Sequence, residues 1–213
     1  MTKINEVYDF LTRKYSVNEP IFLSEISIPG MQAAVMRQQL KKLTEDGRIK
    51  RFDTGIYFLP GKSIFRSGST LSVDEVIRKK YLMNGTERCG YLSGIRFANQ
   101  LGITTQVSSV YEIYTNKATK DYRETRMANI KVILRKPYVK VDEKNASVLQ
   151  FLDLIKEVVD ISEVEGEKLT AVLKGYMKRQ NIEFAALSQF LPFYPERIYK
   201  NMYEVGLLNG ILL

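Results

Sequence analysis

The chain has 213 residues, of which 45% are hydrophobic, and it carries a formal net charge of +8 with an isoelectric point near 9.4, a balance that suits a polyanionic partner. It contains no apolar run near the roughly 18 residues that a membrane span requires and begins without the apolar segment of a signal peptide, so we expect a cytoplasmic protein without membrane contact. The lack of histidine and the single cysteine, Cys89, exclude His-based triads, cysteine clusters, an internal disulfide and most zinc sites.

The first thirty residues predict a helix, a strand and a short helix. Apolar residues at spacings of three and four indicate an amphipathic helix over residues 3–15. Residues 21–23 form an apolar run that predicts a short strand. Ser24 is placed to cap a brief helix through Ile26, and residues 28–30 contain the Pro-Gly pair of a turn.

Residues 31–60 are the most informative stretch of the chain. Their first half predicts a longer helix, with one apolar stripe directed at a core. That stripe consists of residues at spacings of three and four: Ala33, Met36, Leu40 and Leu43. Gly47 is placed to end this helix with a positive φ angle. A hairpin follows, with strands at 48–51 and 56–59, a turn at 53–55, and Pro60 after its second strand.

This order of elements is that of a winged helix-turn-helix domain, in which the long helix enters the major groove and the hairpin, or wing, touches the DNA backbone. Arginine and glutamine can pair with guanine and adenine edges, whereas lysines serve mainly phosphates. We therefore expect DNA-binding residues on the helix at Gln32, Arg37, Gln38, Lys41 and Lys42, and on the wing at Arg48, Lys50, Arg51 and Thr54. The alternative is a winged helix used only for protein contacts, but the basic, amide-rich face favours DNA.

The middle of the chain is its most basic part. Residues 61–140 hold 15 Lys and Arg against 6 Asp and Glu, and either DNA or an acidic protein would suit this charge. Residues 61–70, with two glycines and three serines, predict a linker. A capping box at residues 72–75 predicts a helix to about Met83. Its run of three cations supplies possible additional backbone contacts, or else a solvated face: Arg78, Lys79 and Lys80.

The following segments predict a mixed domain that becomes helical toward its end. Residues 90–102 predict a helix ending at Gly102, and residues 110–115, 130–134 and 138–141 predict strands. After Asn145, a cap residue, two amphipathic helices are expected, with these inner positions: Val148, Leu149, Leu152, Ile155 and Val159 in the first, and Leu169, Val172, Leu173, Tyr176 and Met177 in the second. The aromatic stripe of residues 184–208 favours a core, with a dimer contact as the alternative.

The run GYLSGIRFANQLGITTQVSSVYEIYTNKA, followed by RKPYVKV and preceded by the expected winged helix, resembles the AbiEi family of bacterial abortive-infection antitoxins and its close relatives. The resemblance covers nearly the whole chain. It implies a transcriptional autorepressor that binds inverted repeats in its promoter and opposes a nucleotidyltransferase-like toxin, without a cofactor. Ser108 departs from the proline that many relatives carry after the Thr-Thr-Gln-Val run, which affects only a local turn.

No catalytic constellation or phosphate-binding glycine loop is present in the sequence, so we do not expect an enzyme. The best enzymatic alternative is a metal-dependent nuclease that uses Asp121, Asp142 and Lys144. A third hypothesis is a winged-helix regulator whose C-terminal domain senses a ligand or dimerises and has no toxin partner.

Together these patterns predict an α/β (α+β) protein of two domains. Residues 1–60 would form the winged helix-turn-helix and residues 61–70 a linker. Residues 71–213 would form a mixed α+β domain with a helical C-terminal part. We expect double-stranded promoter DNA and, on two-fold operators, a second copy of the chain as partners, and the resemblance to AbiEi antitoxins implies a cognate toxin as well.

Overall fold

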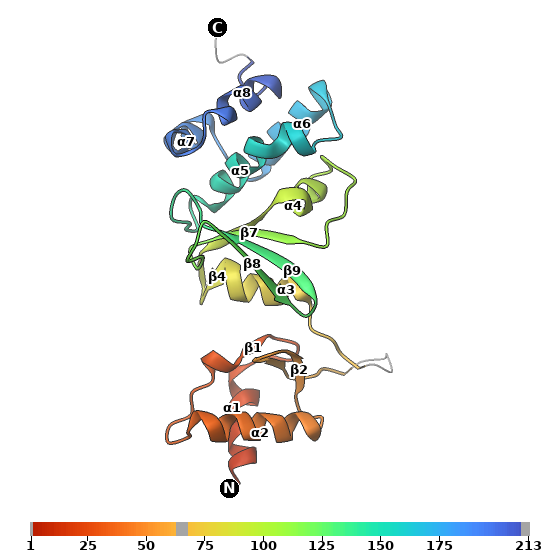
Figure 1. Cartoon of the computed structure of the whole chain (residues 1–213), viewed down its shortest axis with the longest axis vertical. Coiled ribbons are helices and arrows are strands. Elements are labelled where there is room, and N and C mark those ends of the chain that lie inside the picture. Colours follow the sequence, from red (N-terminus) through yellow and green to blue (C-terminus); the bar gives the residue numbers. More distant parts are fainter. Residues whose placement is uncertain (1, 63–67, 210–213) are drawn as a thin grey trace. The chain divides into compact units, whose positions relative to one another are not determined.

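The computed structural model describes residues 2–62 and 68–209 (Figure 1). It divides the chain into two compact units, residues 1–79 and residues 80–213, and each has its own hydrophobic core. The architecture is mixed α/β, with an N-terminal helix–strand–helix–hairpin region, a central mixed sheet and C-terminal helices. Within the described ranges, no helix is long and apolar enough to cross a membrane.

Unit 1 follows the predicted order closely. Its elements are α1 (Lys3–Lys14), β1 (Ile21–Phe22), a 3₁₀ turn (Leu23–Glu25), α2 (Ala33–Glu45), β2 (Lys50–Asp53), β3 (Ile56–Phe58) and α3 (Val73–Ile77). The three strands form an antiparallel sheet in the order β1-β3-β2. The predicted first helix, short strand, long helix and hairpin are confirmed. The brief helix expected from Ser24 is a single 3₁₀ turn, and the predicted linker lies partly outside the described residues, at 63–67.

The helix predicted from residue 72 to about Met83 begins and ends near the expected residues. Only its first part, α3, is α-helical, and the chain continues from it as a π-helical turn, Arg78–Leu82. The Ser72 side chain makes no capping hydrogen bond, so the predicted capping box is absent. The division between the two units falls inside the π-helical turn.

Unit 2 is built on a four-stranded sheet against which helices pack. Its remaining elements are β4 (Met83–Asn84), β5 (Glu87–Arg88), β6 (Gly90–Ser93), α4 (Gly94–Gln100), β7 (Tyr111–Thr115), β8 (Tyr122–Met127), β9 (Ile130–Arg135), α5 (Ala146–Ile161), α6 (Gly166–Arg179), α7 (Phe184–Phe190), a 3₁₀ turn (Leu191–Phe193) and α8 (Arg197–Glu204). The sheet order is β6-β7-β9-β8, with β7 and β9 parallel and the other pairs antiparallel. Strands β4 and β5 form a separate small hairpin.

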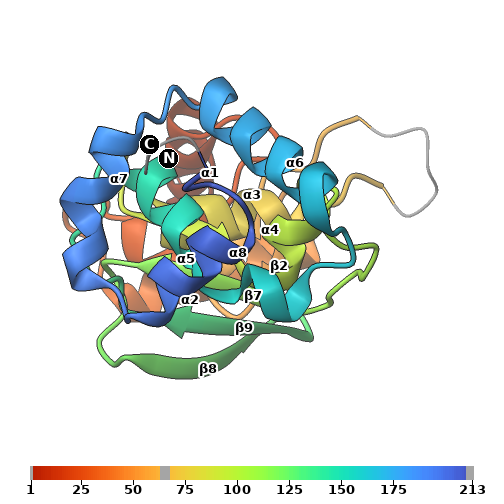
Figure 2. The ribbon, with the colours of Figure 1, turned by 90° about the horizontal axis from the view of Figure 1, so that it is seen from above.

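Helix α5 is the centre of this unit. It packs against β6 and α4 on one side and against α7 and α8 on the other (Figure 1). Four of its five predicted inner residues are buried, whereas Val159, in its last turn, is 45% exposed. Seen from above, β8 and β9 extend beyond the helices, so part of the sheet face on the α5 side is open (Figure 2).

The helix predicted over residues 90–102 is wrong in its first four residues, which form β6 instead. The backbone at Gly90 passes between two others, and a Cβ atom there would lie 2.6 Å from the carbonyl oxygen of Tyr114. Gly94 then adopts a φ of 65°, outside the right-handed helical region. A helix cannot continue through this residue from the segment before it, so α4 begins here. Local apolar spacing does not show these two constraints.

The strand predicted at residues 138–141 is also wrong. Its backbone groups are bound by side chains: Asn116 accepts from the N–H of Val141 and donates to the carbonyl of Val141, and Asn145 donates to the carbonyl of Lys140. The sequence did not reveal the short hairpin β4–β5 or the longer strand β8, an edge strand in which five of six residues are not buried. Strand β8 therefore lacks the apolar alternation that marks a half-buried strand.

Candidate nucleic-acid interface

Helix α2 divides into a buried and an exposed side. Met36, Leu40 and Leu43 are buried together with Val7 and Leu11 of α1 in the core of unit 1. The predicted stripe is correct at these three positions of α2. It is wrong at its first residue, because Ala33 is exposed, and it omitted Gln39, which is 7% exposed.

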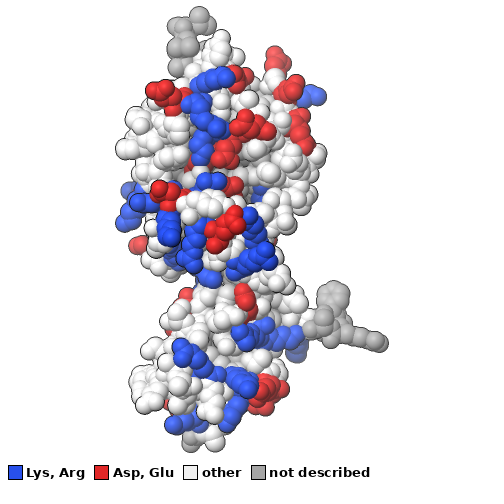
Figure 3. Space-filling model, viewed as in Figure 1, with Lys and Arg blue, Asp and Glu red and all other residues white. Residues whose placement is uncertain are grey.

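The opposite side of α2 carries the predicted contact residues. Arg37, Gln38, Lys41 and Lys42 are all exposed. The ammonium of Lys41 lies 3.8 Å from the carboxylate of Glu45, at an exposed i,i+4 spacing that contributes little stability. In the described part of the chain, the side chains of Arg37 and Lys42 form no hydrogen bond or ion pair. Figure 3 shows Lys and Arg side chains along the face of unit 1 on which Figure 1 draws α2.

Gln32 stands at the start of α2, where the chain is extended and the side chain makes no capping hydrogen bond. It is exposed, as is Ala33 beside it. The amide is therefore available to an external donor or acceptor at the end of the helix that carries the partial positive charge of the backbone dipole.

The tip of the β2–β3 hairpin holds two predicted wing residues in a defined geometry. The guanidinium of Arg51 donates to the hydroxyl of Thr54 (3.1 Å) and to the carbonyl of Asp53 (3.2 Å). The Asp53 carboxylate accepts from the Thr54 N–H at 2.6 Å, and Gly55 turns the chain with a φ of 72°. Both Arg51 and Thr54 are exposed, so the tip presents one cation and one hydroxyl.

The other two predicted wing residues contact their own unit. The guanidinium carbon of Arg48 lies 3.7 Å from the ring centroid of Tyr8, and one of its nitrogens donates to Asn5. The ammonium of Lys50 donates to the carbonyl of Ser69 at 3.1 Å. Both side chains are half-buried, so they are less accessible to DNA than the residues of α2.

The three cations of the π-helical turn differ in their surroundings. Arg78 is exposed. The Lys79 ammonium lies 2.9 Å from the Glu19 carboxylate and 3.4 Å from that of Glu25, and it donates to the Pro20 carbonyl. The Lys80 ammonium lies 5.2 Å from the ring centroid of Tyr81. Lys79 is thus neutralised within unit 1, and Arg78 is the most accessible of the three.

Unit 2 contains a buried polar network that the sequence reasoning missed. On α5, the Lys156 ammonium lies 2.8 Å from the Asp153 carboxylate, and these residues are 8% and 1% exposed. Three tyrosine hydroxyls complete the network: Tyr91 donates to Asp153 at 2.5 Å, Tyr194 donates to it at 3.4 Å, and Tyr114 bonds to Lys156 at 2.7 Å. Two charged residues within the apolar run of α5 were the available signal.

Burial governs the protonation of this network. It raises the pKa of the tyrosine hydroxyls of Tyr91, Tyr114 and Tyr194, and the Asp153 carboxylate raises each of them further. Burial alone would lower the pKa of Lys156, but the Asp153 carboxylate raises it above its ordinary value. The ammonium therefore stays charged and the three tyrosines stay neutral: Tyr91 and Tyr194 donate to Asp153, whereas Tyr114 accepts from Lys156.

The nuclease alternative would need Asp121, Asp142 and Lys144 to act together at one metal ion. The Asp142 carboxylate accepts from the backbone N–H groups of Lys144 and Asn145, both at 2.9 Å, and so closes the turn before α5. Asp121 lies next to β8 and is exposed. In residues 2–62 and 68–209, no group of three His, Cys, Asp or Glu residues is arranged to hold a metal ion.

Comparison with known proteins does not assign the chain to a family. No protein-family model matches it. A search of curated proteins also found no significant match. The resemblance to AbiEi antitoxins therefore stays a prediction based on the sequence run quoted above.

Proposed function

We propose that residues 1–60 form a winged helix-turn-helix that binds double-stranded promoter DNA, and that the protein is an autorepressor and antitoxin of the AbiE type. The observation that carries the DNA-binding part is the exposed side of α2, where Arg37, Gln38, Lys41 and Lys42 lie opposite the buried stripe. The chain supplies groups for base edges and groups for phosphates on the same helix face.

The order of elements supports the same proposal. Helix α1 and the buried side of α2 share one core, and the β2–β3 hairpin follows α2 after only four residues. A helix carried in this way can enter a major groove while Arg51 and Thr54 at the hairpin tip reach the neighbouring backbone. If this side of α2 served only for protein contact, we would expect large apolar side chains to be exposed on it.

The basic surface of unit 2 would add contacts that do not depend on sequence. Arg123 and Arg126 on β8 are exposed, and Figure 3 shows Lys and Arg side chains gathered where Figure 1 draws β8 and β9. Such cations release counterions from DNA and strengthen binding to any duplex. The antitoxin part of the proposal rests on the sequence resemblance alone.

The test of DNA binding is a fluorescence-anisotropy titration of the full chain against its own upstream promoter and a scrambled duplex over a series of salt concentrations. We expect promoter preference at every salt, with a slope of log affinity against log salt of about −0.9 per phosphate contacted. Equal affinity for both duplexes at all salt concentrations would overturn the autorepressor proposal.

The antitoxin role is tested separately by co-expression with the product of the adjacent open reading frame. We expect that product to arrest growth when expressed alone and the full chain to restore growth. If the neighbour is harmless, or if the chain gives no rescue while still binding its promoter, the protein is a regulator without a toxin partner.

A further inference from the structure

A cleft opens in unit 2 where β9 ends and the chain turns toward α5. Its volume is about 410 Å³, within the range of roughly 300–1,000 Å³ that small-molecule sites occupy. The cleft combines aromatic, cationic and acidic side chains: Tyr114, Asp121, Arg135, Lys136, Pro137 and Tyr138.

The floor of the cleft is held in place by the buried network of α5. The Tyr114 hydroxyl is bonded to the Lys156 ammonium at 2.7 Å, and that ammonium lies 5.4 Å from the ring centroid of Tyr138. The ring of Tyr138 also packs on Tyr194, with the two centroids 4.6 Å apart. Tyr138 is nevertheless 45% exposed, so part of a rigidly held aromatic ring faces solvent.

Both cationic and acidic side chains lie around the ring of Tyr138 in the cleft. The guanidinium of Arg135 donates through Nε to the Glu112 carboxylate, which balances its charge in part, while its terminal nitrogens form no hydrogen bond among the described residues. Lys136 is exposed and, in the described part of the chain, its side chain forms no hydrogen bond or ion pair. Asp121 supplies the one carboxylate of the lining. The lining thus offers one carboxylate acceptor and two cationic donors, of which Arg135 is already paired with Glu112.

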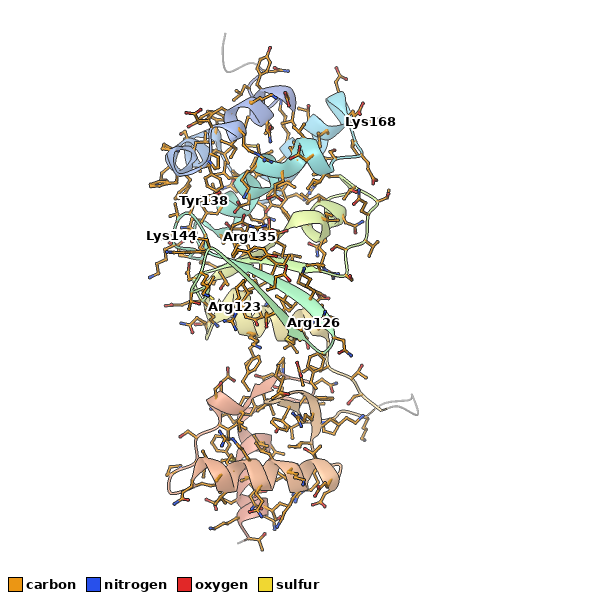
Figure 4. The ribbon with its side chains drawn as sticks, in the orientation of Figure 1. Arg123, Arg126, Arg135, Tyr138, Lys144 and Lys168 are labelled. Carbon is orange, nitrogen blue, oxygen red and sulfur yellow. The ribbon has the colours of Figure 1, made fainter. Side chains whose placement is uncertain are left out.

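The sheet beside the cleft is open. Tyr122 of β8 pairs with Arg135 in the sheet register, is 46% exposed, and has its ring centroid 5.3 Å from the Arg135 guanidinium. Figure 4 shows Arg135 and Tyr138 on the same side of unit 2, whereas Lys168 lies at a distant part of that unit. A ligand in the cleft therefore has room to continue along the sheet toward β8.

We propose that this cleft binds a single nucleotide unit, with its base stacked on the exposed face of Tyr138 and its phosphate bound by Lys136 and Arg135. Asp121 accepts hydrogen bonds from sugar hydroxyls or base N–H groups. A flat π-system, one or two cations and one acceptor match a nucleoside monophosphate better than an inorganic anion, which has no use for the ring.

Two sources could supply this chemistry, a free nucleoside 5′-monophosphate and the end of a single strand. The experiment is isothermal titration calorimetry on the full chain. The probes are the four ribonucleoside 5′-monophosphates, uridine, inorganic phosphate and a single-stranded thymidylate trinucleotide. We expect at least one monophosphate to bind with a dissociation constant below about 1 mM. The nucleoside and phosphate alone should bind about tenfold more weakly.

The variants are chosen so that the fold is maintained. Tyr138→Ala should weaken nucleotide binding by about tenfold or more, and Tyr138→Phe should restore it, because stacking needs the ring and not the hydroxyl. Lys136→Ala should weaken binding of the monophosphate but not of uridine. Lys168→Ala is the matched control, an exposed lysine of the same unit, and should leave binding unchanged. Circular-dichroism melting of each variant verifies that unit 2 is folded.

The outcomes are separable. Tighter binding of the trinucleotide than of any monophosphate assigns the cleft to a single strand, and the reverse order assigns it to free nucleotides; both support the proposal. Phosphate that binds as tightly as the nucleotides, a folded Tyr138→Ala chain that binds like the unchanged protein, or no heat with any probe at about 10 mM overturns it. None of these results depends on whether α2 binds promoter DNA.

Discussion

The two units place their charged groups in opposite ways. In the core of unit 1 the buried side chains are almost all apolar, and the cations of α2 lie on the surface. Unit 2 instead buries Asp153 and Lys156 in the centre of its largest helix. A cation on the surface keeps most of its hydration and can contact an external polyanion. Burying an ion pair has a large desolvation cost, and the pair fixes the packing around it. The position of a charge is therefore more informative here than the net charge of +8.

The largest expected difference comes from removing one member of the buried pair. Lys156→Met leaves the Asp153 carboxylate buried without its cation, so we expect a loss of about 3–5 kcal/mol in the free energy of unfolding, measured by urea denaturation. Lys42→Met, at an exposed cation of α2, should change it by less than about 0.5 kcal/mol. A double variant, Asp153→Asn with Lys156→Met, should recover part of the loss. Similar stabilities for the two single variants would contradict the contrast between the units.

Two buried tyrosine hydroxyls, one in each unit, allow a second comparison of how the units treat buried polar groups. Tyr91 donates to the buried Asp153 carboxylate at 2.5 Å, so Tyr91→Phe should cost about 1.5–3 kcal/mol. In unit 1 the hydroxyl of Tyr15 is buried without a hydrogen-bond partner among the described residues, and burial raises its pKa to about 12. Tyr15→Phe should therefore be neutral or stabilising by up to about 1 kcal/mol. Thermal unfolding of both variants measures this, and equal losses would show that the hydroxyl of Tyr15 is bonded in solution.

On the surface of unit 1, the expected effects are on DNA specificity. Arg37→Ala should reduce the preference for promoter over scrambled duplex by about 1–3 kcal/mol, because an arginine can pair with a guanine edge. Lys42→Ala should weaken binding to both duplexes alike and reduce the salt slope by about 1. Anisotropy titrations of the full-length variants measure both. An equal loss on the two duplexes for Arg37→Ala would remove it from the base-reading set.

The smallest effect is a pH dependence at the surface of unit 2. The Glu163 carboxylate accepts from the hydroxyl and the backbone N–H of Thr105, both at 2.7 Å, and these bonds lower its pKa from 4.5 to about 2. A carboxylate with a lowered pKa stabilises the fold above pH 4.5 and loses that contribution as the pH falls toward 2. Melting temperatures of the wild type and Glu163→Gln should therefore converge between these pH values. A constant difference across the range would show that the bond does not titrate.

The sequence alone determined the elements whose structure is set by neighbouring residues. Gly47 ends α2 with a φ of 69°, and Gly55 turns the predicted β2–β3 hairpin with a φ of 72°. The apolar spacing of α1 and α2 was sufficient because each buries one stripe against a single core. The same local information identified the exposed face of α2 and its candidate contact residues.

In unit 2, only the tertiary structure decided the elements that the sequence mispredicted or missed. Residues 138–141 have strand-forming side chains, but Asn116 and Asn145 satisfy their backbone groups from elsewhere in the chain. β8 forms because β9 offers it a partner, although its own residues show no alternation.

The buried network and the cleft show most clearly which contacts local sequence patterns cannot predict. Asp153 and Lys156 are three residues apart on one helix, so their pairing is local. Tyr91 and Tyr194 are separated from Asp153 by 62 and 41 residues, and Tyr114 is 42 residues from Lys156. Helical and strand periodicities describe which face of an element is buried, but not which residue of a distant element will meet it there. The folding of the sheet against α5 brings the hydroxyls of Tyr91 and Tyr114 to the charges, and the segment before α8 brings that of Tyr194.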